Sequence, residues 1–128
     1  MIDETIIGMK RVETRTVESL DTALTMGSGD LEVYATPAMV ALMEYTSKEL
    51  IRSFLAPEET TVGISLEVSH VRATPVGHEV SVSAEITEVD GRKITLSLEA
   101  HDGEHLIGQG AHVRVVVDSE RFMSRIGR

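Results

Sequence analysis

The change of hydrophobic period that decides the fold lies in residues 36–72, which read TPAMVALMEYTSKELIRSFLAPEETTVGISLEVSHVR. Thr36 and Pro37 suit the N-cap and first position of a helix, because the Thr hydroxyl can accept an unpaired amide and proline needs none. The pattern predicts a helix from here to about Leu55, since the residue before Pro57 disfavours helical geometry. The first two turns are apolar on nearly every side, which predicts a helix enclosed by other structure.

After Pro57 the apolar period falls from 3.6 residues to two. Odd positions from Gly63 onward are small or polar, whereas the even positions are apolar as far as Val68: Val62, Ile64, Leu66 and Val68. This alternation is typical of a strand with one buried face. The same face continues to His70, an imidazole at the end of an apolar row.

Three later segments repeat the alternation and are predicted strands: residues 79–88, 94–100 and 105–117. Asp-Gly dipeptides on either side of the middle one predict hairpin turns. Gly108 and Gly110 indicate a bulge or bend in the last strand. Residues 8–17 are a candidate strand before the helix.

The order is therefore strand, helix, then four strands with short connections. One-sided strands and an enclosed helix need each other, so we expect an α+β hot-dog fold, an antiparallel sheet wrapped around one long central helix. A chain of 128 residues fits a single domain, residues 1–128. Residues 18–35 have little periodicity and are predicted to form a flexible connection that could act as a lid. Residues 118–128 are expected to add a short helix or to fray.

The composition excludes several classes of function. With 21 acidic and 12 basic side chains the net charge is -9, and no basic run is present, so we expect no binding to nucleic acid or to a membrane surface. No apolar run approaches the ~20 residues that a membrane helix needs. The absence of cysteine excludes thiol chemistry and fits a cytoplasmic protein.

Three polar residues in apolar surroundings are the candidates for chemistry. Glu44 follows an apolar helical run, His70 ends the buried face of a strand, and Thr36 starts the helix. Each alone has a plain alternative: a polar gap for Glu44, a strand-end position for His70, a cap for Thr36. Together they supply the acid, base and hydroxyl used in acyl transfer, near helix amides that can polarise a carbonyl.

One geometric objection stands against a simple triad. Thr36 and Glu44 are separated by eight helical residues, a rise of ~12 Å, so they cannot touch within one regular helix. A shared site needs an irregular helix start, an intervening His70, or a partner subunit that supplies one member.

Residues 101–105, HDGEH, match a short zinc-peptidase pattern, but that chemistry requires a helix. Here an Asp-Gly pair lies between two alternating strands, which predicts a hairpin tip. We expect no metal and no other cofactor, and we interpret His78 and His112 as structural.

Over roughly residues 10–120 the chain resembles the thioesterase-like hot-dog family that includes fluoroacetyl-CoA thioesterase. The resemblance is carried by ATPAMVALMEY, TVGISLEVSHVRATPVG, VDGRK, AHDG and IGQGAH. The resemblance implies that Thr36, Glu44 and His70 are catalytic and that Gly63 lies beside the thioester. It also implies homodimers, with sheets joined edge to edge and active sites at the interface. Dimers could pair further into tetramers.

The segment before Thr36 departs from the family pattern. At residues 27–30 the chain reads GSGD and lacks the aromatic residues of the fluoroacetyl-specific member, which implies another acyl group. Residues 27–34 are expected to shape the acyl pocket, with Tyr34 contacting the substrate.

The implied function is hydrolysis of a small or medium acyl-CoA to free acid and CoA. Glu44 would act as nucleophile or as base for a water, His70 would transfer protons, and Thr36 would orient the other two or the substrate. Anionic CoA would need local positive charge, for which the candidates are Arg72, Arg92, Lys93 and Arg114; each could instead be a solvated strand residue.

Two other functions compete with hydrolysis. One is a noncatalytic hot-dog dimer that binds acyl-CoA or another apolar ligand, which an intact set of three polar residues argues against. The other is a hot-dog dehydratase, for which the sequence shows no Asp and His pairing on a suitable loop.

Overall fold

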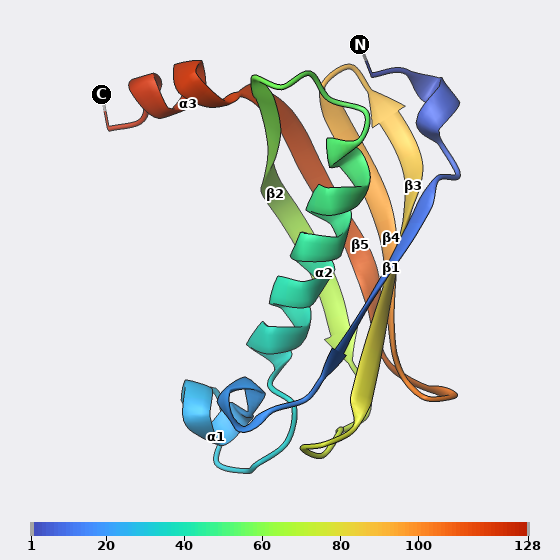
Figure 1. The fold of residues 1–128 in the computed structure, drawn as a ribbon, viewed down its shortest axis with the longest axis vertical. Helices are drawn as coiled ribbons and strands as arrows, with labels where there is room; N and C mark the ends of the chain where they lie inside the picture. The colour runs from blue at the N-terminus through green and yellow to red at the C-terminus, as the bar shows by residue number, and fades with distance from the viewer. Residues whose placement is uncertain (1, 128) are drawn as a thin grey trace.

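A computed structural model describes residues 2–127 and places a five-stranded sheet against one long helix (Figure 1). The strand order is β1-β3-β4-β5-β2, and all neighbouring strands are antiparallel. The strands are β1 Lys10–Thr16, β2 Glu59–His70, β3 Glu79–Asp90, β4 Lys93–Asp102 and β5 His105–Asp118. The helical elements are η1 Glu4–Ile6, η2 Ser19–Asp21, α1 Ala23–Met26, α2 Thr36–Arg52 and α3 Ser119–Arg125. The predicted α+β hot-dog fold and the two hairpins are confirmed.

The core lies between α2 and the inner face of the sheet. The inward positions of the two central strands are buried as their alternation predicts: Val80, Val82, Ala84, Ile86, Ile94, Leu96, Leu98 and Ala100. Met39, Met43 and Ile51 of α2 pack on them and are fully buried. Burial of each such side chain stabilises the fold by roughly 1.5–3 kcal/mol. No helix within residues 2–127 is long and apolar enough to cross a membrane.

Helix α2 differs from the prediction at both ends. Its N-cap is Ala35, without a side-chain cap, and Thr36 is already helical, so the predicted capping role of Thr36 is wrong. The helix ends at Arg52 rather than near Leu55. Ala41 and Tyr45 are exposed, so α2 is not enclosed on all sides; the sheet covers only one of its faces.

Strand β2 contains a bulge that the alternation did not predict. The pairing of β2 with β5 shifts between Gly63 and Ser65, and the extra residue, Ile64, is 54% exposed. Before the bulge the inward residue is Gly63, opposite Arg114; after it Leu66 faces inward, opposite His112. A bulge moves every preceding side chain to the other face. The prediction of a buried face was therefore right for Leu66, Val68 and His70 and wrong for Val62 and Ile64.

Gly108 and Gly110 of β5 lie where other parts of the chain come very close. A Cβ on Gly108 would lie 2.6 Å from Met39 Sδ of α2, and one on Gly110 would collide with the backbone carbonyl of Glu67 in β2. The register between β4 and β5 also shifts beside Gly108, so the predicted bulge is present there. Both glycines thus let the edge strand and the helix approach β5.

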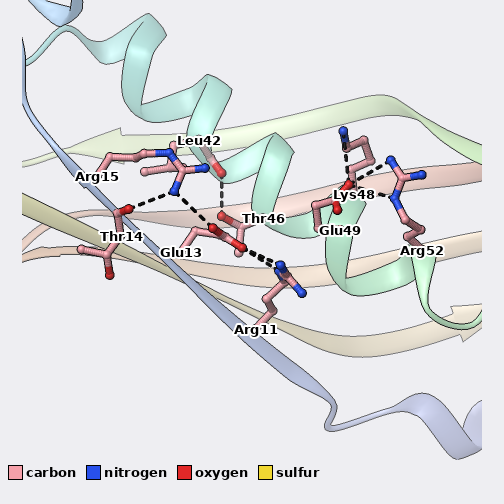
Figure 2. A network of polar contacts seen from close by, with 9 residues as sticks. All are labelled: Arg11, Glu13, Thr14, Arg15, Leu42, Thr46, Lys48, Glu49 and Arg52. Carbon is pink, nitrogen blue, oxygen red and sulfur yellow. Dashed lines mark hydrogen bonds and ion pairs between the residues drawn. The ribbon is translucent and has the colours of Figure 1, made fainter.

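The opposite edge of the sheet is polar (Figure 2). In β1, Glu13 accepts a hydrogen bond of 2.8 Å from Arg11 Nε and also pairs with Arg15. On α2, Glu49 pairs with Lys48 and Arg52. These exposed pairs contribute little to stability individually, at most about 1 kcal/mol each.

We predict that Gly110→Ala destabilises the protein by about 3 kcal/mol, because the new Cβ overlaps backbone that has no alternative position. Urea unfolding measures the change. The adjacent exposed Gln109→Ala serves as control and should stay within about 0.5 kcal/mol of the parent. Equal stability of the two variants would contradict the packing described for β5.

Candidate functional site

Thr36 and His70 meet at one end of the molecule. Thr36 Oγ1 and His70 Nδ1 share a hydrogen bond of 2.7 Å, which joins the first turn of α2 to the last residue of β2. We call these two residues the hydroxyl–imidazole pair. Both line a cavity of about 300 Å³, whose other walls are Ala23, Ser28, Val33, Tyr34, Val71, Arg72 and Ala73. The hydroxyl that local sequence rules assigned to a cap is therefore used by the site.

The second nitrogen of His70 has no hydrogen-bond partner within residues 2–127, although it is buried. An unpaired buried polar atom is unfavourable, so this nitrogen lacks the partner that a buried ring nitrogen needs. Burial lowers the pKa of His70, with the Arg72 backbone acting in the opposite direction. The imidazole is therefore neutral at pH 7 and can accept or pass on a proton.

Glu44 lies in a second group of polar residues further along α2. Its carboxylate is 45% exposed rather than buried, and Oε2 lies 3.5 Å from Arg114 Nη1. A Cβ on Gly63 would lie only 2.9 Å from the same Oε2, so glycine is needed for the carboxylate to reach β2. We call Glu44, Gly63, His112 and Arg114 the carboxylate cluster.

Arg114 is buried, not a solvated strand residue. It is 6% exposed, its Nε donates to Thr61 Oγ1 at 2.8 Å, and its Nη2 donates to the Thr61 carbonyl at 2.9 Å. Burial lowers the pKa of Arg114, while Glu44 acts to raise it. The guanidinium is placed to hold Glu44. Because it is buried, it cannot reach the phosphates of a ligand that lies in open solvent.

His112 was interpreted from the sequence as merely structural, and the structure brings it into the cluster. It is 1% exposed; its Nδ1 lies 2.8 Å from the Ser65 carbonyl and must donate to it, which leaves Nε2 to accept from Arg114 Nη1 at 3.1 Å. Burial lowers the pKa of His112; Arg114 lowers it further, and the Ser65 carbonyl and Glu44 oppose this shift.

A signal for His112 and Arg114 was present in the alternation of β5. Both are even-numbered, so they lie on the same face of the strand as Val116, whereas Val113 and Val115 lie on the other face. Only the register shows which face of β5 is directed toward α2. His112 lies opposite Leu96 and Arg114 lies opposite Ile94, and Leu96 and Ile94 are fully buried. Hydrophobicity alone would have placed the valines inside.

Tyr34 lies against the hydroxyl–imidazole pair. Its ring meets the His70 ring edge-on, with 6.4 Å between centroids, and burial raises the pKa of its phenol to about 12. The residues before it form η2 and α1, and α1 ends at Gly27 with φ of 78°. Residues 18–35, predicted as a flexible connection that could act as a lid, thus contain two short helical elements and contribute to the cavity wall.

The structure brings two of the three predicted catalytic residues together and leaves the third apart. Thr36 and His70 touch, whereas Glu44 belongs to the carboxylate cluster around Gly63. Along β2, Gly63 and His70 are separated by roughly 20 Å. The objection raised from helix geometry therefore holds within one chain.

Comparison with known proteins identifies the family. The model of the fluoroacetyl-CoA-specific thioesterase family matches residues 17–120. The chain belongs to this family. Fluoroacetyl-CoA thioesterase from Streptantibioticus cattleyicolor is 40% identical over 95 residues, which cover 74% of this chain and 68% of that protein. The expected thioester hydrolase is thereby confirmed.

Solved structures agree with this membership. A mutant of the fluoroacetyl-CoA-specific thioesterase in complex with fluoroacetate and CoA is similar with a TM-score of 0.86 and 34% identity, covering 91% of this chain and 98% of that one. A Thermus thermophilus protein, a thioesterase superfamily member, has a TM-score of 0.85 and 27% identity, covering 92% and 88%.

In this family member the hairpin prediction for residues 101–105 is also confirmed. Asp102 pairs with His105 across the turn between β4 and β5, and His78 Nδ1 lies 3.0 Å from Asp102 Oδ2. His78 is therefore paired on the surface, away from both groups described above.

We predict that stability decreases as the pH falls below about 6.5, the ordinary pKa of histidine. The folded-state pKa values of His70 and His112 are lowered, so the unfolded chain binds these protons more readily; their contribution is complete above pH 6.5 and is lost below it. Urea unfolding at pH 7.5 and 5.5 measures the difference.

His112→Gln should reduce that pH dependence by up to about 1 kcal/mol. His105→Gln, which removes an exposed histidine, is the matched control and should leave it unchanged. The same pH dependence in His112→Gln as in the parent would show that His112 is not protected from protonation in the folded state.

Proposed function

We propose that this protein hydrolyses small or medium acyl-CoA thioesters to the free acid and CoA. The observation that carries the proposal is the hydroxyl–imidazole pair, which opens onto a cavity and leaves one buried imidazole nitrogen unpartnered. The related protein solved with fluoroacetate and CoA supports a CoA thioester as the substrate class.

His70 is suited to the proton transfers of this reaction. Water must lose a proton as it adds to the carbonyl, and the CoA thiolate gains one as the C–S bond breaks. A neutral imidazole of lowered pKa can perform both transfers, and the Thr36 hydroxyl fixes the orientation of the ring. Because thiolates leave readily, a single imidazole is sufficient.

Glu44 supplies the carboxylate. Arg114 holds it from one side, and the missing side chain of Gly63 lets the carboxylate lie against β2, where the thioester carbonyl is proposed to approach it. From this position Glu44 either attacks the carbonyl or activates the attacking water. The role of Arg114 is then to position Glu44, in place of the contact with CoA expected from the sequence.

We predict that Glu44→Gln and His70→Ala each lower kcat by at least about 100-fold, because general acid–base groups contribute that much. Release of free thiol from acyl-CoAs of increasing chain length measures activity and identifies the acyl class. Glu49→Gln, which changes a carboxylate of α2 that pairs with Lys48 and Arg52 and not with the site, and His105→Ala are matched controls that should keep full activity.

Full activity in either site variant would remove that residue from the mechanism. Binding of acyl-CoA without hydrolysis of any chain length would instead favour the noncatalytic dimer.

The acyl group is proposed to enter beneath residues 18–35. The cavity wall there is built from small or aliphatic side chains, Ala23, Ser28 and Val33, with Tyr34 beside His70. Aromatic side chains are missing from residues 27–30, which supports an acyl group larger than fluoroacetyl. Several large apolar side chains of this segment are exposed and could contact an acyl chain: Leu20, Leu24, Met26 and Leu31.

The active form is proposed to be a homodimer with composite sites. β2 is an edge strand, and its free edge spans 12 residues. Antiparallel pairing of two β2 strands about Leu66 and Glu67 places His70 of one copy beside Gly63 of the other. The hydroxyl–imidazole pair of one copy then meets the carboxylate cluster of the second. Unpaired edges of this length also favour association. Pairing of dimers into tetramers and location in the cytoplasm remain predictions from the sequence.

We predict that a heterodimer of one His70→Ala chain and one Glu44→Gln chain retains about half of the activity of the parent dimer, since one of two composite sites is intact. Two affinity tags allow its purification. A heterodimer of His70→Ala with Thr36→Ala is the control, and it should be inactive because the hydroxyl–imidazole pair is broken in both sites. If both heterodimers are inactive, the site is built within one chain.

A further inference from the structure

A basic pocket lies beneath α3, away from both groups of the proposed active site. Its volume is about 320 Å³, and it is lined by Arg92 of the β3–β4 turn, the end of β5, and α3 with the residue that follows it: Val116, Val117, Asp118, Arg121, Phe122, Arg125 and Ile126. Figure 1 shows α3 projecting from the end of β5, next to the start of β2. Segments that are distant in sequence thus bring three arginines and one aromatic ring to one pocket.

The charge of this pocket is opposite to that of the chain. Three arginines and one carboxylate line the pocket, and a second carboxylate, Glu59, pairs with Arg92 from outside the lining, in a protein of net charge -9. The lining carboxylate, Asp118, is engaged, because its Oδ1 accepts a 2.9 Å hydrogen bond from the backbone amide of Arg121 at the start of α3. Within residues 2–127 no carboxylate lies within ion-pair distance of the Arg121 or Arg125 guanidinium, and Arg92 Nη1 is 3.6 Å from Glu59. The pocket therefore keeps a local positive charge that suits an anion.

The position of the pocket relative to the carboxylate cluster sets the length of its ligand. Asp118 lies opposite Glu59 in the β2–β5 ladder, and Arg114 lies opposite Gly63. Four strand residues therefore separate the pocket from the point where the thioester would lie, a distance of ~13 Å. The pantetheine arm of CoA contains two amide groups and is about as long as four extended residues, roughly 14 Å.

We propose that this pocket binds the nucleotide end of CoA, an adenosine with a 3′-phosphate and a 5′-diphosphate. This inference rests on the proposed function and names the part of the substrate that the active site does not hold. Arg121 and Arg125 contact the phosphates from α3, Arg92 contacts them from the turn, and Phe122 offers a ring for the adenine. Arginine is suited to this task, because its planar group binds phosphate oxygens in pairs. Among residues 2–127, the cavity at the hydroxyl–imidazole pair is lined by one arginine, Arg72, and by one aromatic ring apart from His70, that of Tyr34.

The first test compares one acyl group on two carriers. For the acyl-CoA, the double variant R121Q/R125Q should raise KM about tenfold and leave kcat unchanged, since two partly solvated charge-assisted contacts are lost. For the same acyl group on pantetheine, which has no nucleotide, KM and kcat should not change. Arg11→Gln, which removes a positive charge from β1 at the opposite edge of the sheet, should affect neither substrate (Figure 2). Equal effects on both carriers, or no effect on the acyl-CoA, would overturn the assignment.

The second test does not depend on catalysis. Calorimetric titration of the full chain with adenosine 3′,5′-bisphosphate should show binding that weakens with added salt and is lost in R121Q/R125Q but kept in Arg11→Gln. Binding with this pattern supports the pocket even if no thioester is hydrolysed, which would count against the proposed function alone. Hydrolysis of acyl-CoA and acyl-pantetheine with equal kcat/KM, together with no binding of the bisphosphate, would overturn the pocket and leave the thioesterase proposal intact.

Discussion

The extra residue in β2 is the constraint on which the site depends. Ile64 occupies a bulge, so the strand presents Gly63 to α2 before it and Leu66 after it. Without the bulge, either His70 or Gly63 would face away from the helix, because strand side chains alternate. A single edge strand therefore carries both a glycine that admits Glu44 and an imidazole that meets Thr36.

A buried cation accompanies this arrangement and must be fully satisfied. Arg114 is held by Thr61, His112 and Glu44, so all three arms of its guanidinium have partners. Removing one partner of a buried charge is strongly destabilising, by about 3–5 kcal/mol when the charge is left uncompensated. Hydrophobic residues at the positions of His112 and Arg114 would pack equally well, so stability alone does not explain why these two residues are polar. Their contacts with each other and with Glu44 do explain it.

Periodicity predicted most of the fold because the central strands and α2 bury one regular face each. The failures have local physical causes. Thr36 followed by Pro37 matches the start of a capped helix, yet a 2.7 Å bond to His70 from the far end of β2 uses the Thr36 hydroxyl instead. The bulge at Ile64 cannot be recognised from the sequence, because the alternation of apolar and polar residues continues through it. In β5 the even-numbered residues, which include His112 and Arg114, face inward because of the register with β4. Predicting the roles of His112 and Arg114 needed that register, which residue patterns alone do not contain.

Helix α3 has no buried residue and is joined to the rest of the molecule through the end of β5. Substitutions on such a surface change folding free energy by only about 0.5 kcal/mol. Substitutions in α3 are therefore hardly constrained by the need to keep the protein folded, whereas substitutions of Gly63 or Gly110 are constrained by it. Descendants of this chain can thus change what they recognise at α3 while the reaction chemistry stays fixed, so affinity for the carrier and catalysis can evolve at separate rates.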